Sequence, residues 1–420
     1  MRGAALAFTL VTSLTSPVQA QESSPASVDS LRQRLEDLES MVEMLREQLA
    51  TESGAAVRTR SRIAMELHGR VLVNALRTSS GSNNADVPQF ATRILGLERP
   101  GGNTMSMRQT TLGFAVSSPD IFGANFSGDL DVDFFGGQFG SSGGRHFPLM
   151  RLRTARAALM WDRFTLMAGQ EQPLIADVDP ISLAAVGTPG FTAAGNLWLW
   201  LPQVRASYET AGRLRMGIQA AVLAPMPSGT VGTTNTIFDA AERTGQPTLQ
   251  GRVSARWGPE ESAGEIGVGV HHGRVKTIFD STEVTSSAVA VSGIVPITRF
   301  VELRGEFFDG QALAGLGGGG IGQGINLENN PVRTRAGWTQ LNLKPNERWT
   351  LGAGIGIDEP DSTDVAQPAD RRRNEVLAVH AQWWPVGPIV VGAEWRRIAT
   401  RYSTGTLRAE HLNLAFGFVF

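Results

Sequence analysis

The last stretch of the chain, Glu410 to Phe420, most constrains what this sequence can fold into. Alternate positions carry large apolar side chains, and the positions between them carry small or polar ones. The apolar set is Leu412, Leu414, Phe416, Phe418 and Phe420. A side-chain period of two is typical of a β-strand with two different faces. We therefore expect a strand that ends in an aromatic residue and presents an apolar row on one side.

The rest of the sequence offers nothing to cover such an apolar face in water. After residue 63 no helical period of useful length occurs, and further strand-like segments repeat the alternation. Apolar residues make up 41% of the chain, yet no run approaches the roughly 18 that a membrane helix needs. The apolar faces should therefore meet lipid. We predict an all-β, 16-stranded antiparallel transmembrane β-barrel preceded by a short N-terminal α-helical coiled coil. For the last stretch, an edge strand of a soluble sandwich is the alternative.

Sixteen segments carry this alternation, and their connections alternate between short and mostly long, as barrels with short periplasmic turns and long outer loops do. The predicted strands are Ala64–Arg77, Met105–Ser117, Gly123–Phe135, Leu149–Met160, Asp162–Gln170, Gln203–Thr210, Gly212–Ala224, Pro247–Gly258, Ala263–Lys276, Glu283–Val295, Ile297–Phe308, Val332–Lys344, Glu347–Asp358, Asn374–Pro385, Pro388–Tyr402 and Leu407–Phe420. An even strand number places the C-terminus and the N-terminal segment on the same, periplasmic side.

Other patterns occupy the residues before the barrel. Residues 1–20 have a basic start, a short apolar run and small residues before Gln21, which predicts a signal peptide. Residues 21–50 predict a periplasmic coiled coil, residues 51–62 a linker, and residues 63–420 the barrel. The seam, spaced alternately by three and four, is Val28, Leu31, Leu35, Leu38, Val42, Leu45 and Leu49. A single amphipathic helix packed on its own domain is the alternative for this segment.

Several short segments resemble the DcaP-like porins of Gram-negative bacteria. They are Leu67-His68-Gly69-Arg70-Val71, Arg108-Gln109-Thr110-Thr111-Leu112-Gly113-Phe114, Gly128 to Gly136, and Arg151-Leu152-Arg153 with Ala168-Gly169-Gln170. The chain departs from the family pattern at Arg156, where an aromatic residue is usual. The resemblance covers about Ile63 to Gln170. It implies a homotrimer of sixteen-stranded barrels that takes up small, often anionic organic acids by passive diffusion.

Alternate residues of a strand face opposite sides, and we call this odd or even position the strand parity. An arginine that faces lipid at the bilayer midplane costs about 2–4 kcal/mol, so charged residues whose parity is opposite to that of the apolar row should face the lumen. A basic ladder on three consecutive strands stands opposite a row of aspartates. These rows either create a transverse field in the pore or pair with other lumen charges. In Leu149–Met160 the arginines break parity, which predicts a bulge. The predicted pore-lining set is Arg70, Asp129, Asp131, Asp133, Arg205, Arg215, Arg252, Arg256, Arg304 and Arg396, and Glu302, Glu306 and Glu394 share its inward parity.

The connection from Glu171 to Pro202 is the longest in the predicted barrel, and it is rich in large apolar residues. Such a run would form an unusual apolar patch if it projected into water. We therefore expect it to fold into the barrel and form the constriction, with Glu171, Asp177 and Asp179 facing the pore. A lid over the mouth or a contact with a neighbouring subunit is the alternative, and Leu197–Leu201 could begin the next strand.

The remaining composition narrows the function. Net charge is -2 and no nucleic-acid motif occurs, so we expect no nucleic-acid partner. The six histidines lie in no nucleophile or metal-binding motif, so we expect no enzyme, no metal and no cofactor. The prediction is an outer-membrane porin for small hydrophilic solutes, with small anionic solutes, outer-membrane lipid and lipopolysaccharide as partners. An envelope-bridging structural protein and an outer-membrane barrel enzyme are the alternatives.

Overall fold

The computed structural model describes residues 63–94, 97–98, 100–136, 148–225, 242–259, 262–276 and 282–420. The chain divides into two units, 1–54 and 55–420, and all described residues belong to the second. The predicted signal peptide, coiled coil, linker and seven seam residues therefore lie outside the described residues. Among the described residues, no helix has the length and apolar character needed to cross a membrane.

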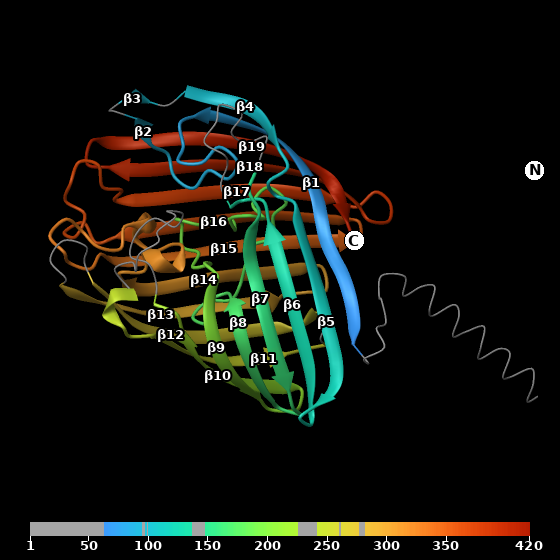
Figure 1. Cartoon of the computed structure of the whole chain (residues 1–420). Coiled ribbons are helices and arrows are strands. Elements are labelled where there is room, and N and C mark those ends of the chain that lie inside the picture. The colour runs from blue at the N-terminus through green and yellow to red at the C-terminus, as the bar shows by residue number, and fades with distance from the viewer. Residues whose placement is uncertain are drawn as a thin grey trace, which may run out of the picture. The chain divides into compact units, whose positions relative to one another are not determined.

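Seventeen of the described strands form one closed antiparallel wall (Figure 1). Closure depends on the first and last strands, β1 (Ala64–Ser80) and β19 (Gly405–Val419), which pair from Arg70 with Val419 to Thr78 with His411. The C-terminal residue extends this seam, because the Phe420 and Gly69 backbones exchange two hydrogen bonds of 2.9 and 3.0 Å. The terminal strand predicted from the sequence is thus the strand that closes the barrel.

The barrel wall has sixteen strand positions, as predicted, although one position is occupied by two shorter strands instead of one. β4 (Pro100–Ser106) and β5 (Thr111–Ile121) lie end to end along the same edge of β1. The prediction of one continuous strand over Met105–Ser117 was therefore wrong at its centre. Residues 107–110 leave the sheet there. The Gln109 side chain bonds inside the barrel to the Ala184 carbonyl (3.1 Å), and the Thr110 hydroxyl, in place of a backbone group, accepts the Leu72 N–H of β1 (3.1 Å).

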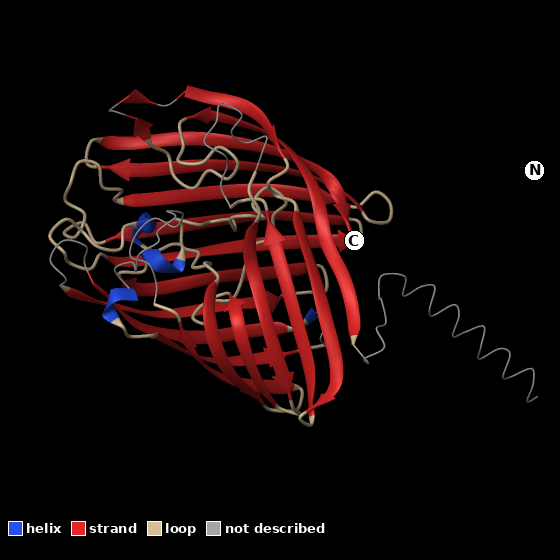
Figure 2. Ribbon diagram, in the orientation of Figure 1, coloured by secondary structure: helices blue, strands red, loops and turns tan. Residues whose placement is uncertain are grey.

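The other strands of the wall follow one another in chain order, and each is hydrogen-bonded to the next. Figure 2 shows that strands make up nearly all of this wall and that helices are confined to connections. A small hairpin of β2 (Arg93–Ile94) and β3 (Leu97–Glu98) lies in the first connection, and the 3-10 helices are η2 (Glu242–Thr244), η4 (Ala314–Leu316) and η5 (Gly320–Gly322). The remaining strands are β6 (Ala124–Asp133), β7 (Arg151–Met160), β8 (Phe164–Glu171), β9 (Leu201–Glu209), β10 (Leu214–Leu223), β11 (Thr248–Trp257), β12 (Gly264–Lys276), β13 (Glu283–Pro296), β14 (Val301–Gln311), β15 (Arg333–Asn346), β16 (Trp349–Pro360), β17 (Arg373–Trp383) and β18 (Ile389–Tyr402).

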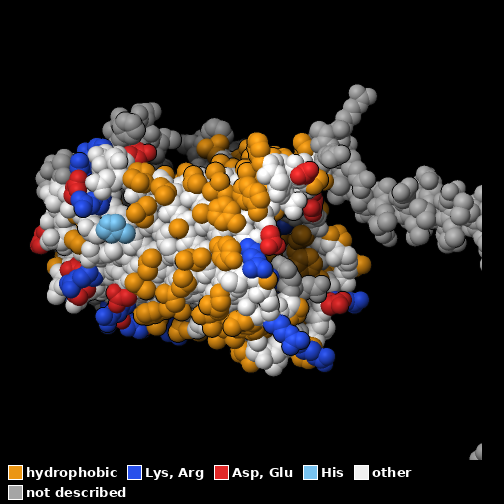
Figure 3. All heavy atoms as spheres, turned by 90° about the horizontal axis from the view of Figure 1, so that it is seen from below, with side chains coloured by type: hydrophobic (Ala, Val, Ile, Leu, Met, Phe, Trp, Pro, Cys, Tyr) orange, Lys and Arg blue, Asp and Glu red, His pale blue; other side chains and the backbone are white. Residues whose placement is uncertain are grey.

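The side chains alternate between the two faces of the wall as the terminal strand predicts. On β19, Leu414 and Phe416 are 52% and 58% exposed on the outside, whereas Asn413 and Ala415 are 1% and 4% exposed. On the face shown in Figure 3, hydrophobic side chains gather over the middle of the barrel, and most charged side chains lie toward its two ends. An apolar band of this kind is typical of the outer face of a barrel that spans a membrane.

The parity break in the fourth predicted strand corresponds to a bulge. The register of β6 and β7 shifts between Asp131 and Val132, so that Thr154 faces Asp131 while Leu152 faces Val132. The extra residue, Arg153, turns inward and donates to the Val186 carbonyl (2.8 Å). The bulge predicted in Leu149–Met160 is confirmed, and it brings three arginines of β7 to the inner face.

The alternating exposure leads to a stability prediction for Leu341. This residue is 47% exposed on the outer face of β15, between Leu303 and Ala353 of the neighbouring strands. Leu341→Arg should lower the free energy of unfolding in lipid by about 2–4 kcal/mol, because the guanidinium would lie in hydrocarbon. Reversible urea unfolding in lipid vesicles measures this change. The matched control is Leu327→Arg in a long connection, where the leucine is 81% exposed; an equal loss in both variants would contradict the outward placement of Leu341.

Candidate pore constriction

A long segment between β8 and β9 lies inside the barrel. This inner loop, residues 172–200, contains no helix and no strand. Its backbone runs through the space enclosed by the strands (Figure 1). Side chains from distant parts of the wall bind this backbone and fix its path. The Ile175 N–H donates to Gln250 of β11 (3.1 Å), the Ile181 N–H donates to Gln340 of β15 (2.7 Å), and Asn74 of β1 donates to the Leu183 carbonyl (3.0 Å).

The apolar residues of the inner loop explain why it folds inward. They are buried against small and aromatic residues of the inner wall, so the loop removes from water the patch that the sequence pattern made conspicuous. The wall makes room for the backbone at Gly356, where a Cβ atom would lie 2.3 Å from the Ala194 carbonyl oxygen. The main cluster is Leu174, Ile175, Ala176, Leu197, Trp198, Leu199, Trp200 and Leu201 with Ala221, Leu223, Ala288, Ala290, Phe308, Leu313, Leu316 and Ala336.

The interruption between β4 and β5 supplies the most extensive anchor of the inner loop. The Gln109 side-chain oxygen accepts hydrogen bonds from the Val186 and Gly187 N–H groups, both at 2.8 Å, and its amide nitrogen donates to the Ala184 carbonyl (3.1 Å). Gln109 is 1% exposed. Sequence reasoning missed this role, although a run of polar residues from Arg108 to Thr111 inside a predicted strand was a signal that the strand is broken.

One side of the inner loop remains accessible. Gln172, Asp177 and the stretch 179–182 are half-buried, and every other residue of the loop is buried. The loop therefore presents a short polar surface to the interior while its apolar side faces the wall.

Two predicted constriction residues lie on this polar surface. Asp177 forms an ion pair with Arg252 (3.0 Å), and Asp179 accepts a hydrogen bond from the Gln172 side chain. Burial raises the pKa of the Asp177 carboxyl above its ordinary value, although Arg252 counteracts this shift. Burial likewise raises the pKa of Asp179, against the Gln172 hydrogen bond and nearby arginines. As the pH falls, these carboxyls therefore lose their charge sooner than exposed aspartates would.

The third, Glu171, belongs to the wall. It is the last residue of β8, not part of the loop, and its carboxylate pairs with Arg156 of β7. The pair fixes the point at which the chain leaves the strand and enters the interior. Arg156, which departs from the resemblance noted above, thus acts as a structural partner at the base of the inner loop.

The predicted basic ladder lies on the inner face of β9, β10 and β11, and carboxylates neutralise much of it. Arg215 and Arg256 face each other across β10 and β11. The Arg252 side chain is fully covered, so it cannot touch a passing solute directly. The ion pairs are Arg252 with Asp177 (3.0 Å) and Glu265 (3.1 Å), Arg256 with Glu265 (3.1 Å) and Glu209 (4.0 Å), and Arg215 with Glu209 (3.6 Å).

The three aspartates on β6 are also paired. Their partners are basic residues that were not in the predicted pore-lining set. Asp129 and Asp133 stand opposite Arg156 and Arg151 of β7 in the sheet register, and Asp131 reaches His68 of β1. Of the two alternatives left by the sequence, the geometry therefore favours local pairing over an uncompensated transverse field. The pairs are Asp129 with Arg156 (2.5 Å), Asp131 with His68 (3.1 Å), and Asp133 with Arg151 (2.7 Å) and Arg153 (3.6 Å).

Three further predicted arginines differ in how they are held. Arg304 pairs with Glu302 (2.5 Å) and donates to the Asp179 carbonyl (2.8 Å), and the buried Arg396 pairs with Glu394. By contrast, the Arg70 guanidinium has no ion pair in the part of the chain that the structure describes. Arg205 of the ladder likewise has no carboxylate within ion-pair distance among the described residues. Its guanidinium instead donates to the Gln203 side chain (3.2 Å) and to the Gln172 carbonyl (2.7 Å).

One of the two glutamates predicted to face inward on β14 also binds the inner loop. Glu306 is 4% exposed and accepts hydrogen bonds from the Leu197 N–H (3.3 Å) and the Trp338 indole (3.3 Å). Leu197 therefore does not begin a strand, and β9 starts only at Leu201. Among the described residues, no three His, Asp or Glu side chains are arranged to hold a metal ion.

Comparisons with known proteins agree with this architecture at the level of fold. No protein-family model matches the chain, and no curated protein matches it in sequence. The outer membrane channel DcaP of Acinetobacter baumannii matches with a TM-score of 0.66 and 17% identity, over 87% of this chain and 100% of its own.

A second similar structure is OmpT, an outer membrane protein of Vibrio cholerae. Its in-vitro folded form matches with a TM-score of 0.53 and 11% identity, over 87% of this chain and 99% of its own. The trimer form of OmpT matches with a TM-score of 0.51, also at 11% identity, over 86% of this chain and 100% of its own. The chain therefore shares the sixteen-stranded barrel fold of the outer membrane channel DcaP.

Proposed function

We propose that this protein is an outer-membrane porin, which lets small hydrophilic solutes diffuse through the barrel and favours anionic organic acids. The observation that carries the proposal is the inner loop, whose apolar side is buried against the wall while its polar side, with Asp177 and Asp179, faces the interior. A loop that narrows a barrel without filling it with apolar side chains is suited to passage of hydrated solutes. The fold shared with a known outer membrane channel supports the same conclusion.

The preference for anions rests on two guanidinium groups. Arg70 and Arg205 lack a carboxylate within ion-pair distance among the described residues, so their charge is available to a solute. Arg70 lies within electrostatic range of Arg153, which repels it, and of Asp131, which attracts it. A guanidinium presents several N–H donors in a fork that matches a carboxylate. Small organic acids are therefore the solutes that this interior suits best.

Removing the middle of the inner loop should widen the pore. Deletion of Ile181–Ala194 should raise single-channel conductance in planar bilayers, because the residues that cross the interior are lost. A point variant tests the anchor: Gln109→Met should increase current fluctuations, since it removes three hydrogen bonds to the loop. Gln367→Met, at an exposed residue of a long connection, is the control. Unchanged conductance in the deletion variant would mean that the loop does not set the pore width.

Charge reversal at Arg256 should move selectivity toward cations. The side chain is 38% exposed and lies beside Glu265 and Glu209, so Arg256→Glu would gather three carboxylates on the inner wall. The reversal potential in a salt gradient reports the change. Arg252 is less suitable for this test because its replacement also removes the ion pair to Asp177. Arg299→Glu, in the turn after β13, is the control, and an identical shift in both variants would argue against a selective role for Arg256.

We also propose that the protein assembles as a homotrimer, aided by the coiled-coil seam, with the coil and the C-terminus in the periplasm. The trimer form of OmpT supports such an assembly for this fold. Replacing Leu35 and Leu38 with serine should lower the temperature at which the oligomer dissociates in detergent, because seam contacts are lost. Glu36→Gln with Asp37→Asn, which lie off the seam, is the control. An oligomer of unchanged heat resistance would refute the contribution of the seam.

A further inference from the structure

The outer face of β14 to β18 carries a row of charged residues at the end of the barrel that bears the long connections. We name it the outer ionic row: Asp309, Arg335, Glu359, Arg373 and Arg401. Cross-strand register places Asp309 beside Arg335, Arg335 beside Glu359, and Arg373 beside Arg401. The pairs measure 2.5 Å for Arg335 with Asp309, 2.9 Å for Arg373 with Glu359, and 3.4 Å for Arg401 with Glu359.

The row directly borders the apolar outer face. One register step toward the other end, the outward positions on β14 to β16 are Phe307, Gly337 and Ile357, and Phe307 is 55% exposed. On β17 the corresponding position is Glu375, which pairs with Arg373 of the row (2.5 Å). Because charged side chains are costly in hydrocarbon, such a row marks the level at which the acyl chains end. A molecule that contacts both the row and the band below it must be amphiphilic.

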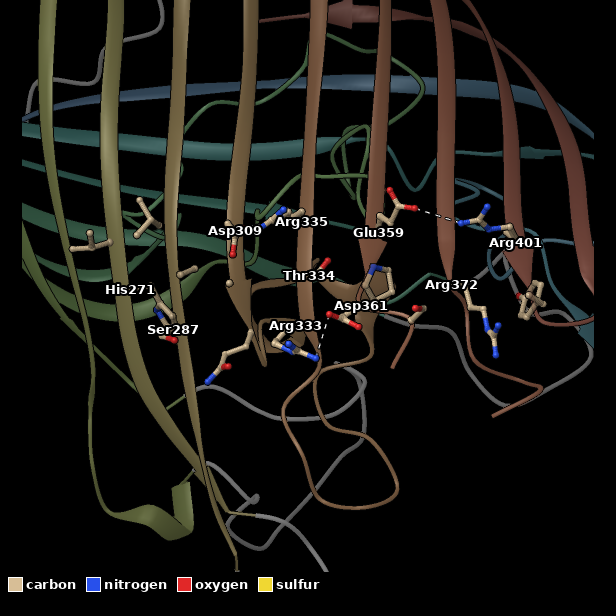
Figure 4. Close-up of a pocket in the computed structure, with 18 of the residues that line it drawn as sticks. His271, Ser287, Asp309, Arg333, Thr334, Arg335, Glu359, Asp361, Arg372 and Arg401 are labelled. Carbon is tan, nitrogen blue, oxygen red and sulfur yellow. Dashed lines mark hydrogen bonds and ion pairs between the residues drawn. The ribbon is translucent and has the colours of Figure 1, made fainter. Parts of the chain in front are cut away.

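A shallow groove of about 1,090 Å³ follows this row (Figure 4). Arginines outnumber carboxylates along it, since Arg333, Arg335, Arg372 and Arg401 line it together with Asp309, Glu359 and Asp361. The Arg335 side chain is 79% exposed, Arg333 is 55% and Arg401 is 54% exposed. The acidic partners hold these guanidinium groups in place, while each group keeps N–H donors for a further ligand. Apolar Val270 and Val289 continue the groove across β12 and β13.

We propose that this groove binds the phosphorylated, acylated disaccharide of lipopolysaccharide. The phosphates would accept hydrogen bonds from Arg335 and Arg401, because the guanidinium fork matches a phosphate in a bidentate way. The acyl chains would lie along the apolar band next to Phe307. The inference rests on the proposed outer-membrane location, since lipopolysaccharide is the anionic amphiphile of the outer leaflet, which the end with long connections faces. It is independent of what passes through the pore.

Binding of bisphosphorylated lipid A to the full-length oligomer in detergent tests the proposal, with native mass spectrometry and the shift in thermal unfolding as readouts. The double variant Arg335→Glu with Arg401→Glu should bind lipid A at least about tenfold more weakly, because two charge-assisted contacts are lost and like charges replace them. The control is Arg163→Glu, at a 48% exposed arginine next to the turn after β7, which should bind lipid A normally.

Two further comparisons identify the ligand chemistry. Lipid A stripped of its phosphates should bind the unaltered protein as weakly as lipid A binds the double variant, whereas inorganic phosphate alone should not stabilise the protein. The unfolding temperature without lipid shows whether the double variant is folded. Conductance should stay unchanged in the double variant, so a failure of channel activity in the unaltered protein would count against the proposed function only.

Three outcomes would overturn the proposal. The first is equal binding of lipid A by the double variant and the unaltered protein. The second is equal loss in the Arg163→Glu control, which would indicate unspecific attraction to a basic protein. The third is a change in oligomer size in the double variant with lipid A binding intact, which would assign this face to a second copy of the chain.

Discussion

A strand at the edge of a sheet leaves a row of N–H and C=O groups unpaired, and the removal of such edges is the constraint on which the whole molecule depends; in hydrocarbon the constraint would be absolute. A sheet meets it only when its first and last strands pair, which β1 and β19 do from Arg70 to Thr78. Closure fixes an inside and an outside for every strand. The alternation of side chains, the polar interior and the apolar band then follow from one geometric condition.

The strands could be predicted from the sequence because their signal is local. Each strand shows its own period of two, and even the bulge in β7 was visible in the spacing of Arg151, Arg153 and Arg156. Parity also assigned the predicted arginines and aspartates to the inner face. The ion partners could not be predicted in the same way, because Asp133 with Arg151 or Arg252 with Asp177 depends on register and on the path of a loop. Those are long-range properties, and a single sequence carries no direct measure of them.

The two faces of one strand can therefore perform unrelated tasks. On β15, the inward Gln340 holds both backbone groups of Ile181, with distances of 2.7 and 3.0 Å, whereas the outward Arg335 belongs to the ionic row. Residues five apart on the same strand thus serve the proposed constriction and the proposed lipid site. Substitutions on one face leave the other unaffected as long as the register holds, which allows the pore and the lipid contact to vary separately.

The anchoring of the inner loop also constrains the order of assembly. Its hydrogen-bond partners come from β1, β11, β15 and β17, which are adjacent to one common interior only after the wall has closed. Until then, apolar residues of the loop such as Leu183 and Val186, which pack against Leu72 of β1 and Ala415 of β19, lack part of the surface that covers them. The nascent chain must therefore be kept from aggregating up to the moment of closure, and a correctly seated loop is evidence that the barrel has been completed.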